Sequence, residues 1–140
     1  MSRENPEARL EEIELFQGLS KRQLKKLLGE SREVRHSAGH HVAEEGLGSL
    51  AFHLILEGDA EVRHGDQALR TLGVGDYFGE ISIIDGKPRS ATVAAGDDGL
   101  TTFAIPYQSF QKLLDDDPGF ARTLLTTLCS RLREAEARSS

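Results

Sequence analysis

The central part of the chain, residues 33–105, is a succession of short β-like runs separated by glycines. "EVRHSAGHHVAEEG" predicts two strands joined at Gly39, and apolar residues alternate on both sides of Gly58 in "FHLILEGDAEVRH". The tetrapeptide "HGDQ" predicts a hairpin turn, while "SATVAA" and "LTTFAI" predict two further strands around the polar turn "GDDG". Many short strands at close, even spacing favour a small antiparallel sandwich or barrel.

Helical periodicity precedes and follows this β region. "PEARLEEIELF" predicts a short amphipathic helix, and Ser20 with Gln23 forms a capping-box pattern before a second helix that Gly29 is expected to end. After residue 106, "YQSFQKLLDDD" predicts a third helix, and Asp117 followed by Pro118 predicts the start of a fourth. The fourth helix carries an apolar stripe of Phe120, Leu124, Leu128 and Leu132.

The whole chain is therefore expected to form one mainly β domain with flanking helices. The helices cover about residues 7–30 and 107–137, and the β region about 33–105, within a single domain of residues 1–140. Cys129 is the only cysteine, and its place on the apolar helical stripe predicts a buried structural thiol.

The formal charge of the chain is −6, which argues against broad binding to nucleic acids or membrane surfaces. The first ten residues are charged, and no apolar run approaches the roughly 20 residues that a membrane span needs. We therefore expect a cytoplasmic protein with neither a membrane nor a nucleic acid as partner.

The stretch "GEISIIDGKPRSATV" places one carboxylate, Glu80, and one guanidinium, Arg89, in mostly small and apolar surroundings. A helical turn after Gly79 would aim several backbone N–H groups at an anion, and the guanidinium can hold two phosphate oxygens. A carboxylate accepts hydrogen bonds from hydroxyl groups. These residues predict a ligand that carries both groups, such as a ribose phosphate; the alternative is a purely structural ion pair.

The longer string "FGEISIIDGKPRSATV" resembles the phosphate-binding cassette of the cyclic nucleotide-binding domain family, which includes protein kinase A regulatory subunits and the catabolite activator protein. The glycine-marked turns in "SAGHHVAEEG", "LILEGDAEV" and "LGVGDYFGE" also lie where this family has them. The resemblance covers most of the chain. It implies a jelly-roll-like antiparallel β-barrel with two N-terminal helices and a C-terminal helical lid.

The resemblance also implies roles for individual residues. Glu80 is expected to accept a hydrogen bond from the ribose 2′-hydroxyl, and Arg89 is expected to pair with the cyclic phosphate. The phosphate site is completed by backbone amides around Gly79, Ile81 and Ser82 and of Ser90 or Ala91. A residue of the last helix is expected to cap the base, and the candidates are Arg131, Arg133 and Glu134.

The family resemblance favours cAMP as the ligand over cGMP. Ser90 stands where the family often has alanine in cAMP binders and threonine in many cGMP binders, so the residue itself is ambiguous. The implied function is signal transduction by a regulatory, non-catalytic domain that has no cofactor and repositions its C-terminal helix. It would act on an effector protein or a fused effector domain, and the same helix could form a homodimer; the chain is either a stand-alone sensor or a piece of a longer protein.

Two other functions are compatible with parts of the sequence. The five histidines raise the possibility of a cupin-like metalloenzyme, but the H-x-H pair that places two imidazoles on one strand face is absent. A non-catalytic interaction module with a degenerate nucleotide site is the other alternative, against which the intact Glu80 and Arg89 argue.

Overall fold

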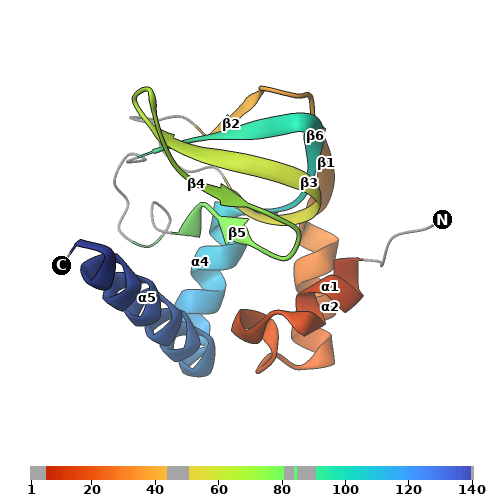
Figure 1. Ribbon diagram of the computed structural model, residues 1–140. Helices are drawn as coiled ribbons and strands as arrows, with labels where there is room; N and C mark the ends of the chain where they lie inside the picture. Colours follow the sequence, from red (N-terminus) through yellow and green to blue (C-terminus); the bar gives the residue numbers. More distant parts are fainter. Residues whose placement is uncertain (1–5, 44–50, 81–83, 85–90, 140) are drawn as a thin grey trace.

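The computed structural model describes residues 6–43, 51–80, 84 and 91–139. An antiparallel sheet forms one side of the molecule, and the helices pack against the other side (Figure 1). The C-terminal helix runs along one edge of this assembly, beside the helix that precedes it (Figure 1).

The N-terminal segment forms α1 (Pro6–Glu12), a 3-10 turn η1 (Glu14–Phe16) and α2 (Lys21–Glu30). The expected helix over residues 6–16 is thus broken, because Ile13 has extended backbone angles. The capping box is confirmed: Gln23 N donates to Ser20 Oγ at 3.1 Å, and Ser20 N donates to Gln23 Oε1 at 2.8 Å. Gly29 does not end α2, which includes it and ends one residue later.

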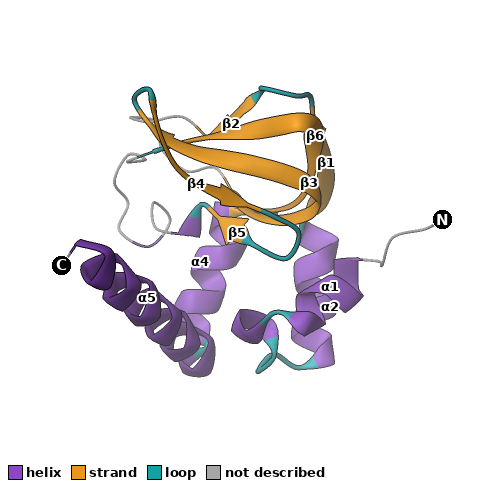
Figure 2. Ribbon diagram, in the orientation of Figure 1, coloured by secondary structure: helices purple, strands orange, loops and turns teal. Residues whose placement is uncertain are grey.

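In the part of the chain that the structure describes, the sheet contains six strands, all paired antiparallel (Figure 2). They are β1 (Arg32–His36), β2 (His41–Ala43), β3 (Ala51–His64), β4 (Gln67–Leu72), β5 (Tyr77–Phe78) and β6 (Thr92–Pro106). The order is β1-β6-β3-β4, with β2 also paired to β6 and β5 to β3. The predicted antiparallel fold with flanking helices is confirmed, although backbone hydrogen bonds do not close this sheet into a ring within the described ranges.

One detail of the strand prediction is wrong. The run "GDDG" does not separate two strands, since β6 continues through it as a single strand. Gly58 pairs with Leu100 whereas Ala60 pairs with Ala95, so the ladder absorbs the extra residues as an irregularity. Gly99 has a φ of +81°, a backbone conformation that side-chain-bearing residues rarely adopt, and this allows the strand to bend rather than end.

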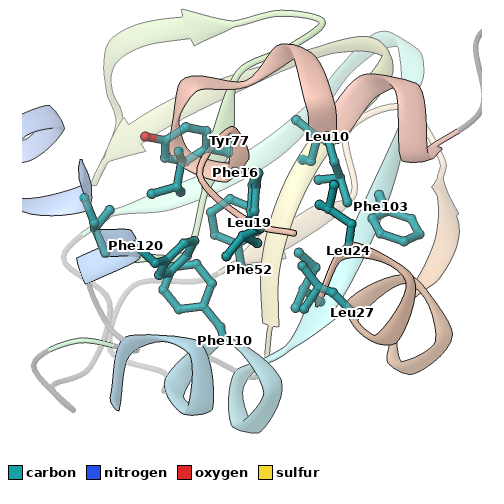
Figure 3. Packing of buried hydrophobic residues seen from close by; sticks show 14 of the residues in the cluster. Leu10, Phe16, Leu19, Leu24, Leu27, Phe52, Tyr77, Phe103, Phe110 and Phe120 are labelled. Atoms are coloured by element: carbon teal, nitrogen blue, oxygen red, sulfur yellow. The ribbon is translucent and has the colours of Figure 1, made fainter. Parts of the chain in front are cut away.

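The core lies on both faces of β3. Phe52, Leu54 and Leu56 face the helices, as their alternation predicted, while Ile55 belongs to a second cluster on the opposite face. Figure 3 shows the aromatic centre of the first cluster, where four phenylalanines from β3 and the helices meet: Phe16, Phe52, Phe110 and Phe120. We call the other set, which includes Val62, Leu72, Phe78, Val93 and Leu100, the second cluster.

The chain ends in α4 (Tyr107–Asp116) and α5 (Pro118–Ser139). Asp117 caps α5 as predicted, because its Oδ1 accepts a hydrogen bond from Phe120 N at 3.1 Å. Only the first part of the apolar stripe is fully buried. Leu132 is 62% exposed, and the prediction of a buried Cys129 is wrong, since this thiol lies on the solvent-facing side of α5. None of the described helices is long and apolar enough to cross a membrane.

Candidate functional site

The predicted carboxylate lies at the end of β5, directly after Gly79. Gly79 has a φ of +99°, and a Cβ atom there would lie 2.5 Å from the carbonyl oxygen of Ala51 on β3. Only glycine fits this close approach without strain. Glu80, the next residue, has helical backbone and is only 4% exposed, so the turn at Gly79 carries its side chain into the protein.

An arginine from α5 balances the buried charge of Glu80. Arg131 Nη1 donates to Glu80 Oε2 at 2.8 Å, which joins the segment after β5 to the C-terminal helix. The guanidinium carbon of Arg131 also lies 4.8 Å from the centroid of the Tyr77 ring, in cation–π geometry. A buried carboxylate without such a partner would cost several kcal/mol, so this pair is a condition for the burial of Glu80.

Tyr77 completes this contact between β5 and α5. Burial raises the pKa of its hydroxyl group, while the charge of Arg131 and a hydrogen bond with Thr127 act in the opposite direction. Thr127 and Arg131 lie four residues apart and therefore on one face of α5. Neither Tyr77 nor Thr127 was predicted as a site residue; the i, i+4 spacing was present in the sequence, but nothing there indicated which ring it would meet.

The three lid candidates are separated by the structure. Arg131 points to Glu80, whereas Arg133 and Glu134 are exposed on other faces of α5.

The described ends of the predicted cassette lie against the same apolar cluster. Phe78 belongs to the second cluster, and Ala91 packs against it. The predicted helical turn is described only at Glu80 and Ile84, which both have helical backbone. The predicted ligand residues Ile81, Ser82, Arg89 and Ser90 lie outside the described residues.

Three histidines gather at another part of the sheet. Thr102 Oγ1 on β6 hydrogen-bonds to His53 Nδ1 at 3.0 Å and to His36 Nε2 at 3.2 Å, and the His40 ring stacks on His36. A cavity of about 500 Å³ borders His36 and His53. Burial lowers the pKa of His36, and the neighbouring His40 lowers it further. Within the described ranges, no group of three or more potential ligand side chains could hold a metal ion.

Comparison with known proteins places this geometry in a family. The family model for the cyclic nucleotide-binding domain matches residues 33–117, more than half of the chain. The chain is 37% identical over 114 residues to a cAMP-dependent protein kinase regulatory subunit of Mycosarcoma maydis, a match that covers 75% of this chain and 22% of that protein. It is 30% identical over 110 residues to a cGMP-dependent protein kinase of Toxoplasma gondii, which covers 79% of this chain and 11% of that protein.

A solved structure gives the same result. The catabolite activator protein of Thermus thermophilus superposes with a TM-score of 0.74 at 29% identity, over 89% of this chain and 60% of that chain. The chain spans only 11% and 22% of the length of the two kinase-related proteins. The resemblance stated from the cassette residues is confirmed: the chain belongs to the cyclic nucleotide-binding domain family.

Proposed function

We propose that this chain is a cyclic nucleotide sensor that binds cAMP in preference to cGMP and regulates rather than catalyses. The observation that carries the proposal is Glu80, a buried carboxylate at the start of the cassette that is joined directly to the C-terminal helix by Arg131. A carboxylate has about four acceptor positions, so Glu80 can accept from a ribose 2′-hydroxyl while it keeps its bond to Arg131. The whole chain, residues 1–140, would act as one sensing domain.

In this proposal the phosphate is held by Arg89 and by backbone amides around Gly79, Ile81, Ser82 and of Ser90 or Ala91. The positive φ of Gly79 supports this arrangement, because it turns the backbone at the entrance to the cassette. The preference for cAMP rests on the family resemblance alone. The relatives of known name include both a cAMP-dependent regulatory subunit and a cGMP-dependent kinase.

In this proposal, ligand binding is transmitted to an effector by a change in the position of α5. Arg131 connects the position of this helix to the carboxylate that receives the ribose. A ligand that binds more tightly when α5 is docked on Glu80 shifts the population toward the docked state. The docked helix would then present a different surface to an effector, which is either a separate protein or a domain fused to this one.

A second copy of this chain is the partner that we propose for the outer face of α5. Leu125 and Leu132 are each 62% exposed on this face, with Cys129 between them. Arg122 lies toward one end of the same face and Glu136 toward the other. In a two-fold antiparallel pair of helices, each of these charges would approach its opposite in the other copy, which favours self-association over an unrelated partner.

Isothermal titration calorimetry with cAMP and cGMP in parallel tests the proposal. Arg89→Ala should weaken nucleotide binding by about 2–5 kcal/mol, the usual effect of removing one partner of a buried charge pair. Arg22→Ala, which removes an exposed arginine from α2, is the matched control and should bind like the wild type. Absence of binding to both nucleotides, or wild-type affinity in Arg89→Ala, would disprove the proposal.

A further inference from the structure

The two helices α2 and α5 begin with caps that are far apart in sequence and adjacent in space. At α2, the Gln23 side chain accepts through Oε1 from Ser20 N. At α5, Asp117 accepts through Oδ1 from Phe120 N. Each side chain has a second polar atom outside these two cap bonds: Nε2 of Gln23 and Oδ2 of Asp117.

Those two remaining atoms bond to each other. Gln23 Nε2 donates to Asp117 Oδ2 at 3.0 Å, across 94 residues of sequence. The direction of the amide is fixed by chemistry, since the opposite orientation would place its NH₂ group against Ser20 N–H and its oxygen against a carboxylate. The hydrogen bond from Phe120 N, followed by the one from Gln23, lowers the pKa of Asp117, so the carboxylate is charged at neutral pH.

The surroundings of this bond include a hollow between α2 and α4. A cavity of about 140 Å³ lies beside the Gln23–Asp117 bond, and residues of α2 and α4 such as Leu27 and Leu113 form its walls. The bond therefore lies at the rim of this hollow, where α2 meets the junction between α4 and α5.

The bond lies at the start of α5, so a change there is transmitted along the helix to Arg131 at the site. Asp117 is the residue at which α4 ends and α5 begins, and Arg131 lies roughly 20 Å further along the helix axis. A small change of direction at Asp117 would move Arg131 by several times the displacement at the cap. Because Phe120 and Leu124 already pack this end of α5 in the core, the bond can adjust the direction of the helix and so shift Arg131 relative to Glu80.

We propose that Gln23 is a positioning residue that holds the start of α5 and thereby favours the state in which Arg131 is bonded to Glu80. The inference rests on the proposed function, because it makes the N-terminal helix a regulator of the same nucleotide site. Any partner or mutation that displaces α2 would weaken cyclic nucleotide binding through this bond.

Four proteins, namely the wild type, two single variants and the double variant, distinguish the effect of the Gln23–Asp117 bond from the effects of the two helix caps. Gln23→Glu keeps the capping box, in which glutamate is as suitable as glutamine, but sets a carboxylate against Asp117. Asp117→Asn keeps a good cap for α5 but replaces the acceptor oxygen by a second NH₂ group facing Gln23. The double variant restores the bond in the reverse direction, with the introduced amide at position 117 donating to the introduced carboxylate at position 23.

The position of α5 can be measured without ligand. A spin label on the native Cys129, which is the only cysteine, and one on Asp66→Cys in the exposed β3–β4 turn give the distance between α5 and the sheet. The measurement is made on labelled protein diluted with unlabelled protein, so that only distances within one molecule contribute. We expect a single narrow distribution for wild type and double variant, and a broader or shifted one for both single variants.

Calorimetry with cAMP on the same four proteins supplies the functional readout. The single variants should bind roughly 3- to 10-fold more weakly, and the double variant should regain wild-type affinity. Unchanged distances in the single variants, or a double variant that behaves like them, would overturn the inference. If the wild type binds neither nucleotide, the proposed function fails, while the distances in the four ligand-free proteins still decide whether Gln23 positions α5.

Discussion

Glu80 combines two properties that rarely occur together, a charge and almost complete burial. Its bond to Arg131 accounts for its burial but uses only part of its capacity to accept hydrogen bonds. Gly79, directly before it, turns the backbone so that the carboxylate enters the protein beside α5. At the scale of the residue, we therefore propose that the remaining acceptor positions of Glu80 serve a hydroxyl group of the ligand.

We predict that Glu80→Gln weakens cAMP binding roughly 10- to 100-fold, since a hydrogen bond to a charged group is worth about 1.5–3 kcal/mol. Calorimetry with 2′-deoxy-cAMP isolates the contact. This ligand should bind the wild type as weakly as cAMP binds the variant, and the variant should lose little further affinity for it. An equal loss for both ligands would instead assign the effect to the freed Arg131.

His36 gives a second prediction at this scale. Its pKa is lowered from 6.5 by burial and by His40, so the unfolded chain takes up a proton at a higher pH than the folded protein does. The free energy of unfolding should therefore rise with pH between the lowered pKa and 6.5, and fall on acidification through that window. Urea titrations at pH 7.5 and 5.5 measure this change.

His36→Gln should reduce that pH dependence, because its amide can still hydrogen-bond to Thr102 but does not titrate. His64→Gln, in the β3–β4 hairpin, is the control and should keep the wild-type difference between the two pH values. A pH dependence that is identical in His36→Gln and wild type would contradict the prediction.

Individual residues also show what the sequence could reveal. The capping pair Ser20 and Gln23 was predictable because both partners lie within one helical turn. The bond from Gln23 to Asp117 was not, since no local pattern indicates which distant helix start lies beside α2. The same limit applies to Arg131. The resemblance implied only that the last helix caps the base, so Arg131 was one of three candidates there, and the rotation of α5 distinguishes it from the other two.

At the scale of elements, α5 is attached by different forces along its length. Phe120 and Leu124 are buried in the first core cluster near its start, whereas Arg131 holds its later turns mainly through polar and cation–π contacts. The second half of the helix should therefore be able to leave the sheet while the first half remains packed. Such an uneven attachment suits a helix that reports on ligand binding.

Arg131→Ala should release that second half. The variant leaves the buried carboxylate of Glu80 without its ion-pair partner and removes a cation–π contact, and opening of the helix returns that carboxylate to water. Amide hydrogen exchange in residues 125–138 should therefore increase by roughly tenfold or more. Exchange in β3 should remain unchanged. Arg133→Ala, which removes an exposed arginine from the same helix, should exchange like the wild type, and equal exchange in both variants would refute this role of Arg131.

The strands show why elements are easier to predict than their boundaries. Alternation identified the inward residues of β3 correctly, since Phe52, Leu54 and Leu56 all face the helices. The division of β6 at "GDDG" was wrong because a turn-forming sequence can also be absorbed as an irregularity when its partner strand bends with it. Whether "GDDG" ends a strand or forms an irregularity within it depends on how β6 pairs with β3. Local composition does not reveal that pairing register.

At the scale of the whole molecule, a chain with a formal charge of −6 is proposed to bind an anion. The general field of the protein opposes this ligand, so affinity must come from short-range contacts within the cassette. The family resemblance predicted the fold because glycines, the cassette and the flanking helices all agreed. It could not predict which faces of α5 remain open, since that depends on how far the helix extends beyond the core.

The open face of α5 leads to the last prediction, which concerns self-association. Sedimentation velocity should detect a dimer of the wild type in which the stripes of Leu125, Cys129 and Leu132 from two copies pack together. Leu125→Lys should weaken the dimer at least tenfold, because burial of a leucine contributes about 1.5–3 kcal/mol and the two-fold symmetry counts the change twice. Thr126→Lys adds the same charge at the adjacent exposed position and should leave the dimer intact. Mild oxidation should also link two wild-type chains through Cys129; a wild type that is monomeric at every concentration would exclude this interface.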